Sequence, residues 1–585
     1  MDRKGIIAVS LSIAVLIVWT IWNSQEMAKV AAQQAKEKAV AAELAPKEKA
    51  AEPAAPEPST PAPAPATPPE PVVEEKTGEV ATPSVTYNFS NLGGGIATAT
   101  LKNHRSEGER LMVLNEFGSI PIGAMSDVAG QGTRVPFSMT VEKGGVSFER
   151  TDARQLQLVK KFTVPASTDM DKDYVVMLAV TFTNRGTQAL TVPAYFIHTG
   201  SASPVHQGDQ ATYTGFMEAG GKFINPGYFD SSWFSSARSA FTVAREDIQW
   251  VGVANQYFTT LVAPHSAAPE ASAGKTPRGQ GAWATRFVIA EADWKKSGHE
   301  SNGSSTVLYG MDGALNMPGI TLQPGASLTQ SFRIFAGPRE YGRLRLMPDG
   351  ESRIMDYGWF GLVSKTLLNS MNWLKGKLGS YALAIIALTL IIKTLLWPMQ
   401  NKATQSMKRM QLLQPKMTEL REKYKDDPTR MNTEVMKLYK DYGVNPLSGC
   451  LPMLVQIPIF FGFFTMLGTA VELRNSKFFW VQDLSLPDTV FHLPWLGWPI
   501  NILPLVMAGT MLWQMAISPK SGDPMQQRIM MFMPVIFIAF CYNYASALAL
   551  YWTVQNLFSI VQLYATRNQA APELQKVAAP AKRKK

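Results

Sequence analysis

The chain has 585 residues, which is too long for one compact core, so we expect several domains. Its formal net charge of +10 suits an anionic partner such as nucleic acid, anionic lipid or a ribosome. The two cysteines, Cys450 and Cys541, lie far apart in apolar segments, which argues against a structural disulfide and excludes a metal site of the C-x-x-C type.

Segment 1–23 is predicted to be an uncleaved signal-anchor helix. Two basic residues precede an apolar run from Ile6 to Trp22, about 25 Å long as a helix. The run ends in Trp19 and Trp22, which favour the membrane interface, and not in the small residues of a cleavage site. A cleaved signal peptide is the alternative. The leading basic residues place the N-terminus in the cytoplasm, so the chain after the anchor is exported.

The exported part is predicted to be a tether followed by a β domain. Residues 24–84 consist mainly of Ala, Pro, Glu and Lys, so they cannot bury a core and should form a disordered spacer. Residues 85–340 show short alternating apolar runs separated by turns, which predicts an all-β sandwich. The histidines of this domain are scattered and match no metal motif, so we expect neither a metal nor another cofactor.

The last third is predicted to be a membrane domain. Residues 356–378 interleave aromatics and leucines with lysines, as in a helix lying in the membrane interface. A five-span core is expected at 379–566, with spans near 380–398, 447–470, 495–517, 529–545 and 547–566. Many cations between the first two of these spans place that segment in the cytoplasm, and the cation-poor stretch 471–494 lies outside. With the anchor this gives six spans and two cytoplasmic termini, the C-terminal one being a basic tail at 567–585.

The cytoplasmic segment 400–443 is predicted to be a helical hairpin. Two apolar stripes with helical spacing are separated at "DDPT", where Asp427 and Pro428 start the second helix. The stripes pack on each other in one interpretation. In the other, Met407, Met410 and Met417 form a surface that docks apolar partners.

One lysine, Lys393, interrupts the first span of the core. It lies little more than one helical turn from the end of the span, so it could extend its ammonium to the headgroups. Thr389, four residues earlier on the same face, favours a polar face directed into the bundle instead. The five spans contain no Asp or Glu between their ends, so an inward Lys393 would need water around it. The sequence therefore predicts a wet, positively charged recess.

Other spans carry polar side chains that could meet this lysine. Gln456 and Gln514 interrupt two apolar runs. A polar row with helical spacing lies in the last span: Trp552, Gln555, Ser559, Gln562 and Thr566. Hydrogen bonding from helix to helix is the alternative role of these residues.

Several motifs resemble the YidC-type membrane protein insertases of Gram-negative bacteria. They are "DYGWF", "FRIFAGP", "GVNPLSGCLPMLVQIP" (443–458), "DPMQQRIMMFMPVIF" (523–537) and "LALYWTVQNLFSIVQ" (548–562), in an order of anchor, β domain and five-span core. The family carries an arginine in a groove that is open to the cytoplasm and to lipid. Lys393 takes this position. Lysine keeps the positive charge but lacks the planar guanidinium with which arginine donates paired hydrogen bonds.

The resemblance implies an insertase and not an enzyme. Nascent membrane proteins would pass a groove formed by Lys393, Thr389, Gln456, Gln514, Gln555 and Gln562, with Tyr551 and Trp552 as the aromatic pair that substrates contact. The resemblance places the chain in the bacterial inner membrane with its large domain in the periplasm. It implies the Sec translocon as a partner, and the basic tail suggests a ribosome or anionic lipid.

Two other function classes remain open from the residues alone. A transporter or channel is the main alternative, although coupled carriers usually place carboxylates at mid-membrane. A sugar-binding β domain is the second, because large sandwiches of this sort resemble mutarotases.

Overall fold

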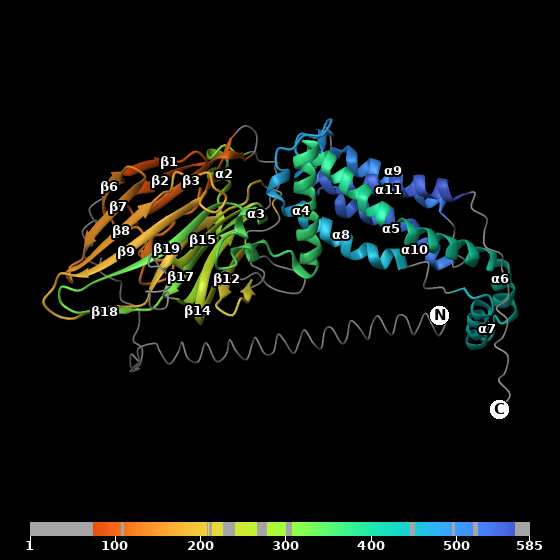
Figure 1. Ribbon diagram of the computed structural model, residues 1–585, viewed down its shortest axis with the longest axis horizontal. Coiled ribbons are helices and arrows are strands. Elements are labelled where there is room, and N and C mark those ends of the chain that lie inside the picture. The colour runs from red at the N-terminus through yellow and green to blue at the C-terminus, as the bar shows by residue number, and fades with distance from the viewer. Residues whose placement is uncertain are drawn as a thin grey trace, which may run out of the picture.

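The computed structural model describes residues 74–106, 110–206, 209, 213–225, 240–265, 278–299, 307–444, 451–493, 498–518 and 524–567. The predicted anchor, most of the tether and the tail beyond residue 567 lie outside these ranges. The described chain consists of a strand-rich part followed by a helical part (Figure 1).

The strand-rich part contains strands β1 to β19 and two short helices. The bounds are β1 Thr77–Ala81, β2 Val85–Ser90, β3 Gly95–Arg105, β4 Leu111–Leu114, β5 Met125–Ser126, β6 Ser138–Glu142, β7 Gly145–Thr151, β8 Leu156–Thr163, β9 Val175–Asn184, β10 Leu190–Val192, β11 Tyr195–Ala202, β12 Tyr213–Glu218, β13 Phe223–Ile224, β14 Ala240–Ala254, β15 Phe258–His265, β16 Gly279–Ile289, α2 Glu291–Lys296, β17 Leu308–Met317, β18 Ile320–Leu322, β19 Ser327–Pro338 and α3 Tyr341–Leu344.

These strands form a β-sandwich. The large sheet runs in the order β5-β11-β17-β16-β14-β15-β19-β9-β8-β7-β6, and a four-stranded sheet runs β1-β2-β3-β4. Buried and less buried positions alternate along β9, as the pleat of a half-buried strand requires. Phe89 of the smaller sheet lies 6.2 Å from Phe148 and 5.3 Å from Phe162 of the large one, ring centre to ring centre. The core therefore lies between the two sheets.

The predicted boundary between tether and β domain needs a correction. Strand β1 lies inside the segment 24–84 that was expected to be a spacer, and it pairs antiparallel with β2. It is an edge strand in which only Val80 is buried, so its sequence shows little of the apolar alternation that identifies a strand. The sandwich thus begins at Thr77.

The helical part begins with two 3₁₀ turns and continues to the end of the described chain. The bounds are η1 Glu351–Met355, η2 Gly358–Phe360, α4 Gly361–Leu378, α5 Tyr381–Leu412, α6 Gln414–Lys423, α7 Pro428–Asp441, α8 Leu451–Thr469, η4 Val471–Leu473, β20 Thr489–His492, β21 Pro499–Asn501, α9 Ile502–Ile517, α10 Pro524–Cys541 and α11 Ser546–Arg567.

Three of these helices differ from the predicted spans, and one of them, α10, is Pro524–Cys541 where 529–545 was expected. Helix α5 continues through Pro398 into the expected hairpin although a proline removes a backbone donor and crowds the preceding turn, because Lys408 beyond it is hydrogen-bonded to the carbonyl of Thr566 on α11. Helix α9 begins at Ile502 and not near 495, since Pro499–Asn501 pairs with Thr489–His492 in a short hairpin. By length and hydropathy, α5 is the one helix among the described residues that could cross a membrane, and Leu454–Thr469 and Ile502–Ile517 are shorter apolar helices.

The sandwich and the hairpin helices α6 and α7 lie at opposite ends of the helical part. In Figure 1, α4 lies between the sandwich and the other helices and runs across their direction. Helices α6 and α7 lie at the far end of the helical part, away from the sandwich. Helix α4 packs against α5 and α8, which fixes it across one end of the bundle.

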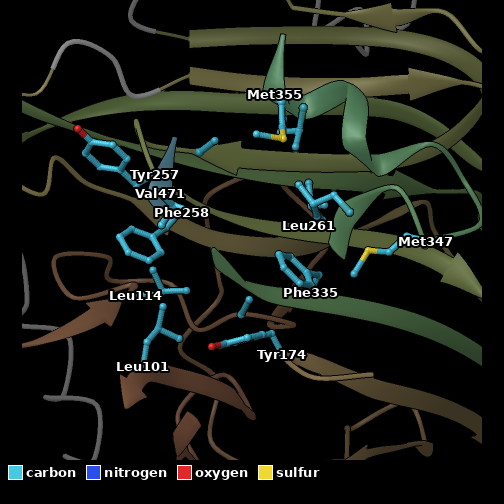
Figure 2. Close-up of a cluster of buried hydrophobic side chains, with 14 of the residues drawn as sticks. Leu101, Leu114, Tyr174, Tyr257, Phe258, Leu261, Phe335, Met347, Met355 and Val471 are labelled. Atoms are coloured by element: carbon cyan, nitrogen blue, oxygen red, sulfur yellow. The ribbon is translucent and has the colours of Figure 1, made fainter. Parts of the chain in front are cut away.

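The sandwich is joined to the helical part through the turn between β14 and β15. Figure 2 shows Tyr257 of this turn and Phe258, the first residue of β15, beside Val471, which lies just after α8, so one apolar cluster includes residues of both parts. Gln256 donates a hydrogen bond to the carbonyl of Gly468. The guanidinium of Arg474 lies 4.7 Å from the ring centre of Tyr257 and 5.7 Å from that of Phe258. These contacts dock the two parts on each other.

Candidate functional site

Lys393 lies on the inner side of α5. Its side chain is 7% exposed, and its ammonium donates a hydrogen bond of 3.0 Å to the hydroxyl of Ser559 on α11. Trp397, one turn further along α5, meets Phe558 edge to face at 5.5 Å, so the two helices pack closely here. Within the described residues, no carboxylate forms an ion pair with Lys393. Among the described residues, the buried ammonium thus has one hydrogen-bond partner, and this partner is neutral.

A second polar group lies between α8 and α11. The side-chain amide of Gln456 donates to the hydroxyl of Tyr551 and to the side-chain carbonyl of Gln555, both at 3.0 Å. Tyr551 is 1% exposed and its ring stacks on Phe463 at 4.1 Å. Three predicted site residues, Gln456, Tyr551 and Gln555, thus form one hydrogen-bonded group. Thr389 is also buried, but its hydroxyl donates to the carbonyl of Ile385 in its own helix.

The polar row of α11 faces the bundle interior. Gln555, Ser559, Gln562 and Thr566 are each at most 7% exposed, as their helical spacing predicts. The side-chain nitrogens of Gln562 and Trp552 are buried and have no hydrogen-bond partner in the described part of the chain. The Trp552 ring packs against Phe460 at 5.0 Å and Phe537 at 4.7 Å. The row therefore offers donors that water or a guest molecule could satisfy.

One predicted residue lies apart from this group, and one polar contact was not predicted. Gln514 is half-buried near the end of α9, where its backbone carbonyl accepts a hydrogen bond from the hydroxyl of Ser518. The polar link from α9 to α11 is made by Thr510, whose hydroxyl accepts from the Asn556 amide at 3.0 Å. Asn556 is one residue beyond Gln555 and therefore outside the helical spacing of the polar row, so the sequence carries no signal that singles it out.

The hairpin residues have a core of their own. Leu413, Met417, Tyr439 and Val444 form a small buried cluster, and Met410 packs against it. Met407 is half-buried and is not part of this cluster. Packing between the two stripes thus accounts for Met410 and Met417, while Met436 of α7 is 47% exposed.

The outer faces of the helices are apolar. Large exposed hydrophobic side chains are found on each of α5, α8, α9, α10 and α11: Leu383, Leu390, Ile391, Leu395, Leu454, Phe461, Leu505, Val506, Leu512, Trp513, Phe532, Val535, Ile536, Phe540, Leu557, Val561 and Tyr564. A surface so apolar would aggregate in water and suits lipid. The polar group around Lys393 and Gln456 thus lies inside a bundle whose outer faces are apolar, unlike those of a soluble bundle.

Comparisons with known proteins agree with this architecture. The family model described as 60Kd inner membrane protein matches residues 373–573, and the model of the YidC periplasmic domain matches residues 78–370. The chain is similar to the membrane protein insertase YidC of Syntrophus aciditrophicus, with 32% identity over 592 residues that cover 97% of this chain and 100% of the relative. The corresponding protein of Pelobacter propionicus is 31% identical over 510 residues, covering 83% and 85%.

Among solved structures, an active YidC insertase crystal structure with the first transmembrane domain resolved is 18% identical, covers 85% of this chain and 94% of that chain, and has a TM-score of 0.34. Together the two family models extend over nearly the whole described chain, from the first strand to the last helix. The full-length relative confirms the resemblance that the sequence motifs indicated. The chain therefore belongs to the YidC family of membrane protein insertases.

Proposed function

We propose that this chain inserts nascent membrane proteins into the inner membrane and that the polar interior around Lys393 receives their hydrophilic segments. Relatives of nearly full length are named insertases, and the family is not an enzyme class, so no bond is broken. Because the chain belongs to this family, we propose the insertase function in place of the transporter or channel alternative. The observation that carries the site proposal is the buried ammonium of Lys393, whose hydrogen-bond partner is the neutral hydroxyl of Ser559.

The mechanism derives from desolvation. A polar or acidic tail that crosses a lipid core alone loses its hydration at a cost of several kcal/mol for each unsatisfied group. Beside Lys393 such a tail gains an attractive charge, and beside Gln562 and Trp552 it gains donors that have no other partner within the described residues. The cost of entry is lower there than in lipid.

The apolar span of the substrate takes a different path. The outer faces of α8, α10 and α11 carry large hydrophobic side chains, so a substrate helix can lie against them and remain in lipid. Trp552 lies between Phe460 and Phe537, where α8, α10 and α11 meet. We infer that Tyr551 and Trp552 mark the boundary between the polar path and the apolar one.

The topology and the partners belong to the same proposal. The sandwich is the periplasmic domain of the family, so α4, at its side of the bundle, lies at the periplasmic interface. The hairpin of α6 and α7 at the far end is then cytoplasmic, where it and the basic tail can meet a ribosome and an emerging substrate. Six spans, two cytoplasmic termini and cooperation with the Sec translocon complete the proposal.

The test is insertion of a single-span substrate with an acidic leading tail, in cells depleted of the native insertase. Wild type is compared with Lys393→Arg, Lys393→Gln and Lys393→Glu at equal protein levels. Lys402→Gln, at an exposed position of the same helix, is the matched control. We expect wild type, Arg and the control to insert the substrate and Gln and Glu to fail, because only the first three keep a positive charge at position 393.

Two outcomes would count against the proposal in different ways. If wild type does not restore insertion, the insertase function itself is wrong for this chain. If all four side chains at position 393 support insertion equally, the function stands but the charge does not act on the substrate, and Lys393 serves only to pack α5 against α11.

A further inference from the structure

A cleft of about 630 Å³ lies where the sandwich meets the start of α4. One wall is the turn between β12 and β13, and the other is the segment that leads through η1 and η2 into α4. Three cations line it, namely Lys222, Arg353 and Lys365. Lys393 and the other residues of the proposed insertion path do not line this cleft.

Positive charge exceeds negative charge in this cleft, with three cations and one carboxylate in its lining. Within the described residues, none of the three cations forms an ion pair, and Asp356 is the one carboxylate in the lining, where it accepts from the backbone of Gly358 at 3.4 Å. Lys365 lies 5.3 Å from the ring centre of Tyr341. Burial lowers the pKa of Lys365, and the charge of Arg353 lowers it further. Positive charges that repel each other in this way favour a bound anion.

Exposed apolar side chains line the same cleft. Trp359 is 98% exposed and Leu362 is 82% exposed. Both are on the η2–α4 segment, and α4 runs across the direction of the membrane helices in Figure 1. Tryptophan and leucine beside lysine and arginine are typical of the depth at which lipid headgroups meet acyl chains. A soluble anion would gain nothing from these two side chains.

We propose that this cleft binds the phosphate of an anionic phospholipid, such as phosphatidylglycerol, from the periplasmic leaflet. The cations at Lys222, Arg353 and Lys365 surround the phosphate, while Trp359 and Leu362 enter the acyl region beside it. The bound lipid ties the sandwich and α4 to the membrane surface at one point. It thereby fixes the height of the bundle relative to the periplasmic face, independently of any substrate.

The test measures lipid binding by the purified full chain in detergent. Bound molecules are counted by native mass spectrometry during titration with phosphatidylglycerol, with phosphatidylcholine of the same acyl chains, or with inorganic phosphate. The variant Lys222→Gln/Arg353→Gln/Lys365→Gln removes the three charges. Lys377→Gln, at an exposed position of the same helix outside the cleft, is the matched control.

We expect each lost cation to weaken phosphatidylglycerol binding about fivefold, so that the triple variant loses roughly a hundredfold. Phosphatidylcholine binding and the control variant should be unchanged. Lys222 and Arg353 are exposed, so Lys222→Gln and Arg353→Gln alone should fold normally and give the fivefold effect even if the triple variant does not accumulate.

Three results would overturn the proposal. Equal phosphatidylglycerol affinity in wild type and in the charge variants would show that the cleft does not bind it. An equal loss of phosphatidylglycerol affinity in Lys377→Gln would show that a positive charge anywhere on α4 attracts the lipid and that the cleft is not a specific site. Displacement of the lipid by inorganic phosphate at similar concentration would show a site for free phosphate.

Discussion

Replacing Lys393 by methionine should leave the bundle as stable as before, or more stable, while insertion is lost. A lysine at the centre of a membrane helix costs about 2.5–3.5 kcal/mol, which is an upper bound for Lys393 because it lies nearer the end of its span. The single hydrogen bond to Ser559, in which the donor is charged, returns about 1.5–3 kcal/mol of this. The net cost of the buried charge, after the hydrogen bond is subtracted, is between near zero and about 2 kcal/mol. Methionine has a similar length and no charge, so the variant does not carry this cost.

The assay pairs stability with function in the same samples. Thermal unfolding of the detergent-solubilised chain gives the stability, and substrate insertion in depleted cells gives the function. Ser559→Ala supplies an internal check through a double-mutant cycle. It should cost about 1.5–3 kcal/mol in wild type, because the ammonium loses its described partner, and much less in the Lys393→Met background.

Two results would refute this reasoning. If Lys393→Met destabilises the chain by more than about 2 kcal/mol, Lys393 holds the bundle together and lost insertion would need no contact with substrate. If Ser559→Ala costs the same in both backgrounds, the two side chains are not coupled, and their hydrogen bond does not offset the cost of the buried charge.

Three further predictions concern other parts of the chain. Burial lowers the pKa of Lys160, which lies within the sandwich, from 10.5 to about 7. Between about pH 7 and 10.5 the unfolded chain therefore binds more protons than the folded chain, so stability rises with pH. In thermal unfolding, the free energy of unfolding should increase by about 3 kcal/mol from about pH 6.5 to 9.5. The Lys160→Met variant should lose this increase, and Lys161→Met, at the exposed neighbouring position, should retain it. Arg474→Ala should lower stability by about 1–2 kcal/mol through loss of its ring contacts at the junction, whereas Lys477→Ala on the same loop should not; equal effects would show that Arg474 does not dock the sandwich on the bundle. Asp427→Ala should cost about 1 kcal/mol and speed hydrogen exchange in the first turn of α7 only, since its carboxylate caps that helix; unchanged exchange would exclude the cap.

The fold class was predictable because the hydropathy of each part is distinctive. Alternation identified the strands, and long apolar runs identified the helices. The errors lie where local sequence and tertiary structure disagree. Strand β1 reads as a spacer because the neighbouring strand and not its own composition orders it. Helix α5 does not end at Pro398, since contacts with α11 such as the hydrogen bond from Lys408 to the carbonyl of Thr566 hold it beyond that residue.

The site was predictable in its residue types but not in its pairings. Helical spacing placed Gln555, Ser559 and Gln562 on one face of α11, and the structure has them buried there. The partner of Lys393 is 166 residues away in sequence, so only the packing of α5 on α11 identifies it as Ser559. Gln514 lies on the helix that meets α11 through Thr510 and Asn556, and no pattern in the sequence could assign that contact.

The distribution of polarity supports the proposal that the interior of the bundle receives a guest. Buried polar groups in a stable protein are normally paired, because each unpaired group costs about 1–3 kcal/mol. Here the side-chain nitrogens of Trp552 and Gln562 lack a partner within the described residues, and Lys393 carries a charge that no described carboxylate balances. Apolar side chains of the same size at these three positions would pack as well and avoid these costs. A bundle that needed only to span the membrane gains nothing from such groups, whereas one that must lower the cost of a polar chain crossing lipid depends on them. For this reason the three side chains should be the positions where gains in stability and losses of insertion occur together.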